Sequence, residues 1–310
     1  MTPLRAWEAR TPTGRRLQLA ALLKYLRGDQ GLTQVQAAEA AWPGRASARS
    51  KLVMIEKGDR TVELDDLRAL LTIYQASSPG VVDLAHRLRD GSSQRGRWRG
   101  ARASHDVALR PYVDLEEDAV RLRHVSSEQL PDQLQCPSYM EADYPRHTED
   151  PAEADALEAR RLRQANVILR QDNPPEVLTI FSESCIRRVQ GNDPTIMREQ
   201  IEFLLQLQQL EHVTLQIVPF RRPDLARRRP ASSIARQGIL ERFSLLRLTV
   251  PEVPEETSRQ LDLAFTKTGN ELAWTGNVEH YEILWTNALA AALRPAKTRL
   301  LLEEARRDFT

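Results

Sequence analysis

The chain has 310 residues, of which 41% are hydrophobic and 28% are charged, a composition typical of globular proteins with buried cores. Two cysteines are too few for a disulfide scaffold or a four-cysteine zinc site, and they suit a reducing compartment. No apolar run reaches the roughly 18–20 residues that a membrane span needs. Charged residues at positions 8, 10, 15 and 16 precede the first apolar stretch, which argues against a secretory signal. We therefore expect a cytoplasmic protein with no membrane segment.

The near-neutral net charge of +1 hides two oppositely charged parts. Residues 1–110 carry 19 Lys and Arg against 11 Asp and Glu, whereas residues 111–310 carry 25 against 32. A basic N-terminal part is expected of a chain whose first domain meets a polyanion. The charge pattern therefore favours a nucleic-acid partner for the N-terminal part.

Four helices are predicted in the first 75 residues. Leucines at helical spacing predict the first over residues 14–27. Thr33 and Gln36 form a capping-box pattern that opens the second helix. The third, over residues 47–57, is followed by Gly58, a typical left-handed terminator. The fourth covers residues 63–74, so this part of the chain is expected to be all-α.

The rest of the sequence mixes helix and strand patterns. Residues 90–104 are rich in Gly, Ser and Arg and are expected to form a linker. Helices are predicted over residues 113–125, 151–169, 193–210 and 278–293, and after Pro295. Strands are predicted over residues 177–181, 213–220, 243–250, 261–266 and 272–274. The sequence therefore predicts a larger α+β domain over residues 105–310.

The turn between the second and third helices gives residues 1–89 the layout of a helix-turn-helix domain. In such a unit the second helix crosses the phosphate backbone, and the third places its N-terminal side chains at base edges in the major groove. Polar or small residues should therefore begin both helices. We expect DNA contacts from Thr33, Gln34, Arg45, Ser47, Arg49, Ser50 and Lys51. Operators of such proteins consist of two DNA half-sites, each bound by one subunit, so a homodimer on double-stranded DNA is expected.

The same region resembles the DNA-binding domains of Cro/repressor-type regulators, the XRE family. The resemblance lies in GLTQ at residues 31–34 and SKLVMIEKGDR at residues 50–60. The whole chain resembles antitoxin-like transcriptional regulators of filamentous GC-rich bacteria, which join this domain to a C-terminal domain of no assigned chemistry. Further matching stretches are YVDLEEDA at 112–119, LPDQLQ at 130–135, IRR at 186–188, MREQI at 197–201 and VTLQIVPF at 213–220.

Several features depart from the pattern of these regulators. Val53 and Met54 stand where members commonly carry polar or basic residues, and residues 221–237 do not match the usual loop. Fewer phosphate contacts would give weaker and less salt-dependent DNA binding. The departures therefore concern DNA affinity and leave the fold expectation unchanged.

The sequence shows no pattern typical of catalysis. It contains no Gly-rich phosphate loop, no nucleophile elbow and no dinucleotide fingerprint. The six histidines are scattered without metal-ligand spacing. A nucleophilic Cys136 or Cys185, paired in space with His105 or His280, is the alternative to buried, inert thiols. We expect no catalytic residue, no cofactor and no metal site.

Two hypotheses about function follow. The first is a dimeric, sequence-specific transcriptional regulator whose C-terminal domain senses a partner protein, small and acidic or toxin-like, or a small-molecule ligand. The second is a repurposed protein of a biosynthetic pathway. In that case the C-terminal domain is an enzyme or a small-molecule binder, and the DNA-reading helix has decayed.

Overall fold

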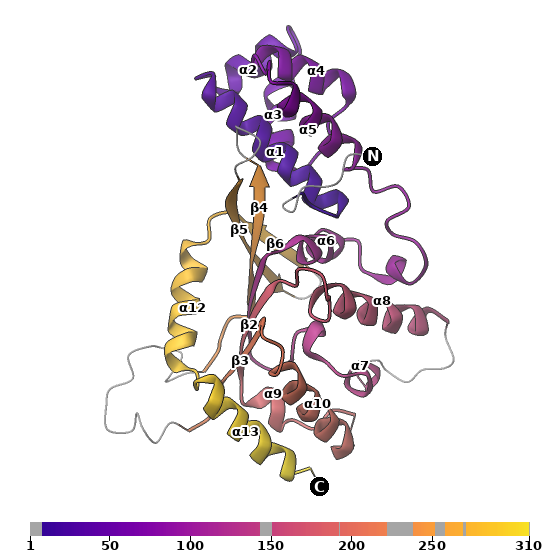
Figure 1. The fold of residues 1–310 in the computed structure, drawn as a ribbon, viewed down its shortest axis with the longest axis vertical. Helices are drawn as coiled ribbons and strands as arrows, with labels where there is room; N and C mark the ends of the chain where they lie inside the picture. The colour runs from indigo at the N-terminus through magenta and orange to yellow at the C-terminus, as the bar shows by residue number, and fades with distance from the viewer. Residues whose placement is uncertain are drawn as a thin grey trace. The chain divides into compact units, whose positions relative to one another are not determined.

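The computed structural model describes residues 8–142, 151–191, 193–221, 238–251, 258–268 and 271–309. The chain divides into two compact units. The first comprises Met1–Trp98, Val113–Asp118 and Leu248–Leu261, and the second comprises Arg99–Tyr112, Ala119–Arg247 and Asp262–Thr310. The predicted fold class, an all-α N-terminal region followed by an α+β domain, is confirmed (Figure 1). The domain limits predicted at residues 89 and 105 remain a prediction.

Five helices form the N-terminal region. They are α1 (Pro12–Asp29), α2 (Gln34–Ala41), α3 (Ala48–Lys57), α4 (Leu64–Ile73) and α5 (Pro79–Asp90). Each contributes fully buried aliphatic side chains to one core, among them Leu22, Ala37, Leu52, Leu67 and Leu84. The four predicted helices are therefore confirmed, and α5 is an addition to them.

The predicted start of α2 and the predicted C-terminal end of α3 are confirmed in detail. The Thr33 hydroxyl accepts a hydrogen bond from the backbone N–H of Gln36, and the Gln36 side chain accepts one from the Thr33 N–H. This is the capping box, which satisfies two N–H groups that the helix cannot pair. Gly58 ends α3 with φ of 76°, a conformation that residues with a Cβ rarely adopt.

Two aspartates from residues 113–118 hold the start of α1 within the first unit. The Asp118 carboxylate accepts hydrogen bonds from the Arg10 N–H at 2.6 Å and from the Thr11 N–H and hydroxyl. Asp114 accepts one from the Thr13 hydroxyl. A carboxylate at this position also suits the positive end of the helix dipole. Gly14 is part of this arrangement, since a Cβ there would lie 2.0 Å from Asp118 Oδ2.

A six-stranded mixed sheet organises the C-terminal region, in the order β3-β2-β1-β4-β5-β6. The strands are β1 (Arg121–Ser126), β2 (Glu176–Ser182), β3 (Val213–Val218), β4 (Phe243–Pro251), β5 (Ser258–Thr268) and β6 (Glu271–Thr275). β1 pairs with β2 in parallel and with β4 in antiparallel register. All five predicted strands are confirmed, and β1 is added.

The prediction of one helix over residues 113–125 is wrong. The helix α6 (Arg110–Asp118) ends early, and the chain enters β1 at Arg121. Within β1, His124 pairs with Thr179 on one side and with Ser244 on the other. Hydrogen-bonded ladders along both edges stabilise the strand, and this long-range pairing overrides an amphipathic pattern that also fits a helix.

Helices cover both faces of the sheet (Figure 1). On one face, α12 (Glu279–Ala291) buries Trp285 and Ala288 against Val125, Ile180 and Phe243. On the other lie α7 (Pro137–Ala142) and α8 (Pro151–Val167). The remaining elements are α9 (Ser184–Arg187), α10 (Pro194–Leu207), α13 (Pro295–Arg307) and the short 3₁₀ turns η1 (Gly100–Ser104) and η2 (Asp132–Leu134).

Two glycines of α1 give a matched test of the contact at Asp118. We expect Gly14→Ala to lower the free energy of unfolding by roughly 1–3 kcal/mol, because the new methyl group overlaps the carboxylate. Gly28 has open space around it, so Gly28→Ala should raise stability by up to about 1 kcal/mol. Urea unfolding of both variants measures the difference. Equal effects would contradict a close approach at Gly14.

The buried histidines of the second unit predict a loss of stability in acid. Burial lowers the pKa of His105 to about 4 and that of His124 to about 3. Both rings stay neutral in the folded state while the unfolded chain takes up protons below its pKa of about 6.5, so stability present above that pH falls as the pH drops. We expect a smaller loss between pH 7.5 and 5 for the double variant His105→Gln/His124→Gln than for the parent. His280→Gln, at an exposed site, should behave like the parent.

Candidate nucleic-acid interface

The turn between α2 and α3 follows from its sequence. Trp42 ends α2, its backbone N–H bonding to the carbonyl of Ala38. Gly44 then adopts φ of 71°, which reverses the chain at little cost only for glycine. Ser47 is the N-cap residue of α3, with no side-chain hydrogen bond to the helix. Its hydroxyl therefore does not cap α3.

A buried carboxylate joins the three helices of this region. The Glu56 side chain on α3 is only 2% exposed and accepts hydrogen bonds from Arg27 Nε at 2.6 Å and Nη2 at 3.1 Å. Gln34 Nε2 on α2 donates to the same carboxylate at 2.7 Å. Arg27 on α1 also donates to the backbone carbonyl of Leu32. Bidentate pairing of this kind fixes geometry as well as charge, so Glu56 sets how α1, α2 and α3 meet.

A second cluster joins α3, α4 and the turn. Lys51 on α3 donates its ammonium group to Asp66 on α4 and lies 4.5 Å from the centre of the Trp42 ring. The Trp42 indole N–H donates to the same Asp66 carboxylate at 2.8 Å. The Lys51 side chain is only 7% exposed. These contacts hold the start of α3 against α4.

The seven residues predicted to contact DNA fall into two groups. Five of them are exposed: Thr33 at the start of α2, Arg45 in the turn, and Ser47, Arg49 and Ser50 at the start of α3. Gln34 is half-buried and bonded to Glu56, and Lys51 is buried and paired with Asp66. DNA contact by these residues remains a prediction. For Gln34 and Lys51, the internal contacts mean that substitution is also expected to disturb the helices.

The exposed surface of α2 and α3 also carries apolar groups. Val35 is 41% exposed and Met54 is 43% exposed, whereas Val53 is half-buried. Apolar side chains in this position can contact the methyl group of thymine. Of the two residues of α3 that depart from the pattern of XRE regulators, Met54 is therefore on the exposed surface and Val53 is half-buried.

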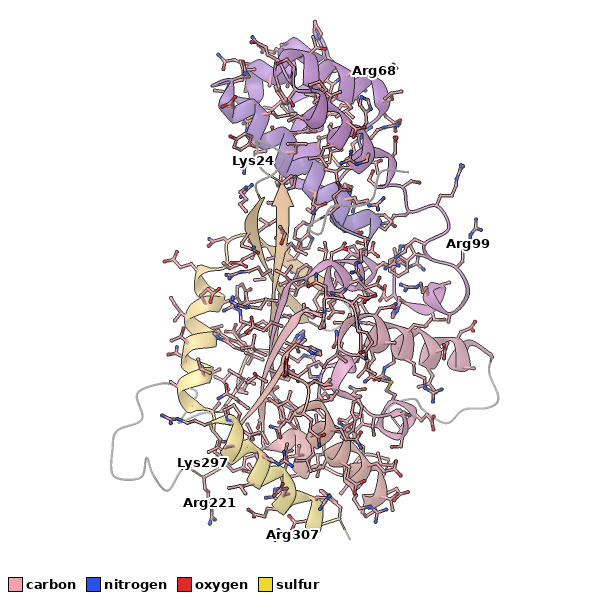
Figure 2. All side chains as sticks on the ribbon, viewed as in Figure 1. Lys24, Arg68, Arg99, Arg221, Lys297 and Arg307 are labelled. Atoms are coloured by element: carbon pink, nitrogen blue, oxygen red, sulfur yellow. The ribbon has the colours of Figure 1, made fainter. Side chains whose placement is uncertain are left out.

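Several residues of this region were missed by the sequence analysis. Arg27, Glu56 and Asp66 received no role, although Glu56 lies within the matching motif. The sequence did offer one signal for Glu56, namely a charged residue next to a core position of the predicted third helix. Basic side chains elsewhere on these helices, such as Lys24 on α1 and Arg68 on α4, are exposed (Figure 2).

The described residues give little support to catalysis. Both cysteines are buried and free, and burial raises the pKa of Cys185 to about 12, which keeps that thiol protonated at neutral pH. No cluster of three or more His, Cys, Asp or Glu side chains there could hold a metal ion. Among the same residues, no helix is both long and apolar enough to cross a bilayer. Most of the unusual loop, residues 222–237, lies outside the described part of the chain.

Comparison with known families decides the broad assignment. A helix-turn-helix domain model matches residues 18–89, and a model named domain of unknown function (DUF5753) matches residues 109–304. The chain belongs to the DUF5753 family. No curated protein and no solved structure matches it. The expected helix-turn-helix domain is thus confirmed, and it supports a DNA-binding regulator with DNA as partner. The DUF5753 domain covers the sheet and the helices around it.

The carboxylate of Glu56 provides a test of how the helix-turn-helix domain is held. We expect Glu56→Gln to lower the free energy of unfolding by about 3 kcal/mol, because it leaves the largely buried guanidinium of Arg27 without its counter-charge. Urea unfolding followed by helical circular dichroism measures this. The control is Asp65→Asn, which removes an exposed pair with Arg68 and should leave stability nearly unchanged. A small effect of both variants would refute the role given to Glu56.

Proposed function

We propose that this DUF5753 protein is a sequence-specific, DNA-binding transcriptional regulator. The observation that carries the proposal is the helix-turn-helix domain with an exposed, polar surface at its turn and at the start of its third helix, where Arg45 and Arg49 respectively lie in solvent. Arginine at such a position suits contacts with phosphates or with guanine. The surplus of basic residues in residues 1–110 supports the same partner, since the electrostatic attraction of a basic domain accounts for much of DNA affinity.

We further propose an XRE-type, antitoxin-like regulator that acts as a homodimer. The motif GLTQ and the segment SKLVMIEKGDR support the XRE assignment. Two-fold symmetry follows from the way helix-turn-helix proteins read paired half-sites. In this proposal the DUF5753 domain senses a partner protein or a small ligand. Its size and its separate core support such a second function.

Arg49 provides the sharpest test, because it is exposed at the start of α3 and forms no ion pair with another described residue. We expect Arg49→Ala to weaken binding to the promoter of the protein's own gene in gel shifts. If Arg49 contacts a phosphate, the slope of log affinity against log salt falls by about 0.9 per lost contact, and sequence preference stays unchanged.

Lys297→Ala is the control for this experiment, since it removes the same charge from an exposed site on α13. It should leave binding unchanged. Unchanged affinity in Arg49→Ala would contradict the role of this residue. A parent protein whose affinity does not respond to salt would contradict the proposed function as a whole. Lys51→Ala is a poorer test, because loss of the contact with Asp66 would lower stability at the same time.

A further inference from the structure

A cavity of about 240 Å³ lies in the second unit, on the face of the sheet opposite α12. It is lined by residues of β1, β4 and β5, by the segment 129–135 and by α8, all of which belong to that unit. Its volume lies below the range of about 300–1,000 Å³ that holds drug-sized molecules. A ligand that fills it would therefore be small.

The wall formed by residues 130–135 is held in place by buried glutamines. Gln164 on α8 donates hydrogen bonds to the backbone carbonyls of Gln133 at 3.0 Å and Gln135 at 2.8 Å. Gln200 on α10 donates to the carbonyl of Leu134 at 2.7 Å. Buried amides that satisfy backbone groups make an irregular segment rigid. The cavity is thus preformed by the protein's own hydrogen bonds.

His124 supplies a hydrogen-bonding atom without a partner. The ring lines the cavity and is only 3% exposed. Its Nδ1 lies 2.9 Å from the Ser244 hydroxyl, which itself accepts a hydrogen bond from the Tyr112 hydroxyl at 3.0 Å. We assign the Ser244 hydroxyl as the donor to Nδ1, since its oxygen already accepts from Tyr112, and the neutral ring then carries its proton on Nε2. Nε2 has no partner among the described residues, and a buried donor left unpaired costs free energy.

The charged groups of the lining favour an anion. They are Arg163, Arg242 and Asp132, two positive charges and one negative. Arg163 donates to Asp132 at 2.8 Å, and its guanidinium lies 5.3 Å from the centre of the Tyr112 ring. Arg242 is exposed at the rim of the cavity. A histidine donor beside this positive field suits the oxygen of a carboxylate.

Aromatic rings complete the wall. Tyr112 and Phe265 both line the cavity, their ring centres 4.9 Å apart, and the Trp274 ring stacks on Phe265. The Tyr112 and Phe265 rings are tilted by 59° to one another, an angle at which a third ring can pack against the face of one and the edge of the other. The lining therefore combines an aromatic part with a donor and a positive charge.

We propose that this cavity binds a small aromatic carboxylate, whose ring packs on Tyr112 and Phe265 and whose carboxylate accepts a hydrogen bond from His124 Nε2. The inference names a ligand class for the sensing role proposed above and rests on it for its biological meaning. The binding itself does not require DNA.

Calorimetric titration of the full-length chain with benzoate tests the proposal. Benzamide keeps the ring without the charge, and acetate keeps the charge without the ring. We expect saturable 1:1 binding of benzoate, at least about tenfold tighter than that of either comparison compound, as one charge-assisted hydrogen bond or one buried ring can provide. Absence of saturable benzoate binding, or equal binding of benzamide, would overturn the proposal.

Two variants locate the binding. His124→Leu should weaken benzoate binding by about tenfold or more, the effect of losing a hydrogen bond to a charged group. Arg242→Gln, at the exposed rim, should fold normally and weaken binding several-fold, whereas Arg99→Gln, exposed outside the cavity, should have no effect. Unchanged binding in Arg242→Gln and His124→Leu would place benzoate elsewhere.

Nitrogen resonances of the histidines decide the matter even if His124→Leu does not fold. Benzoate should shift the Nε2 signal of His124 and leave that of His280, which is 64% exposed, unmoved. The reverse pattern would overturn the proposal.

Gel shifts on the same preparations without benzoate separate the ligand-site proposal from the regulator proposal. Intact DNA binding without benzoate binding rejects the ligand site alone, whereas absent DNA binding rejects the regulator and leaves the titration as an independent result.

Discussion

The shared carboxylate of Glu56 is the contact on which the geometry of the helix-turn-helix region depends. It binds Arg27 through two hydrogen bonds and Gln34 through a third, and so ties α1 and α2 to α3. A buried carboxylate requires such partners, because leaving either charge unpaired would cost several kcal/mol. The same contact removes Gln34 from the open surface. The contact that stabilises the domain therefore also limits how far Gln34 is exposed.

Lys51 illustrates the same principle from the other side of α3. A lysine at the start of a recognition helix suits a phosphate contact, yet its ammonium group is bound by Asp66 and packed on Trp42. The positive charges left exposed near this end of the helix are arginines, Arg45 in the turn and Arg49 in the first turn of α3. Arginine suits this place, since its planar group binds phosphate or guanine through two hydrogen bonds. Lys51 is thus buried because α4 supplies the carboxylate that binds it, whereas Arg45 and Arg49 remain exposed.

In the DUF5753 domain, polar groups are buried where a simple core would hold apolar ones. Gln164 and Gln200 bind the backbone of residues 133–135, and His124 on the central strand β1 faces a cavity rather than a packed core. Polar groups of this kind are costly unless satisfied. Their presence beside aromatic rings and guanidinium groups is the reason to regard this part of the domain as a binding site. The opposite face, covered by α12, is packed with apolar side chains around Trp285.

The sequence by itself determined the local elements and their ends. Leucine spacing, the Thr33 capping box and Gly58 depend on neighbours within a few residues, so α1 to α4 could be predicted. It also determined the class of the two regions and the presence of a helix-turn-helix domain. Only the tertiary structure decided that residues 121–126 form a central strand, since its partners β2 and β4 lie about 55 and 120 residues further along the chain. The partners of Gln34 and Lys51, and the unpaired nitrogen of His124, were likewise decided by packing. Whether a polar side chain stays in solvent depends on groups that are distant in sequence but come within hydrogen-bonding distance in the fold. The spacing of residues along the chain does not predict those contacts.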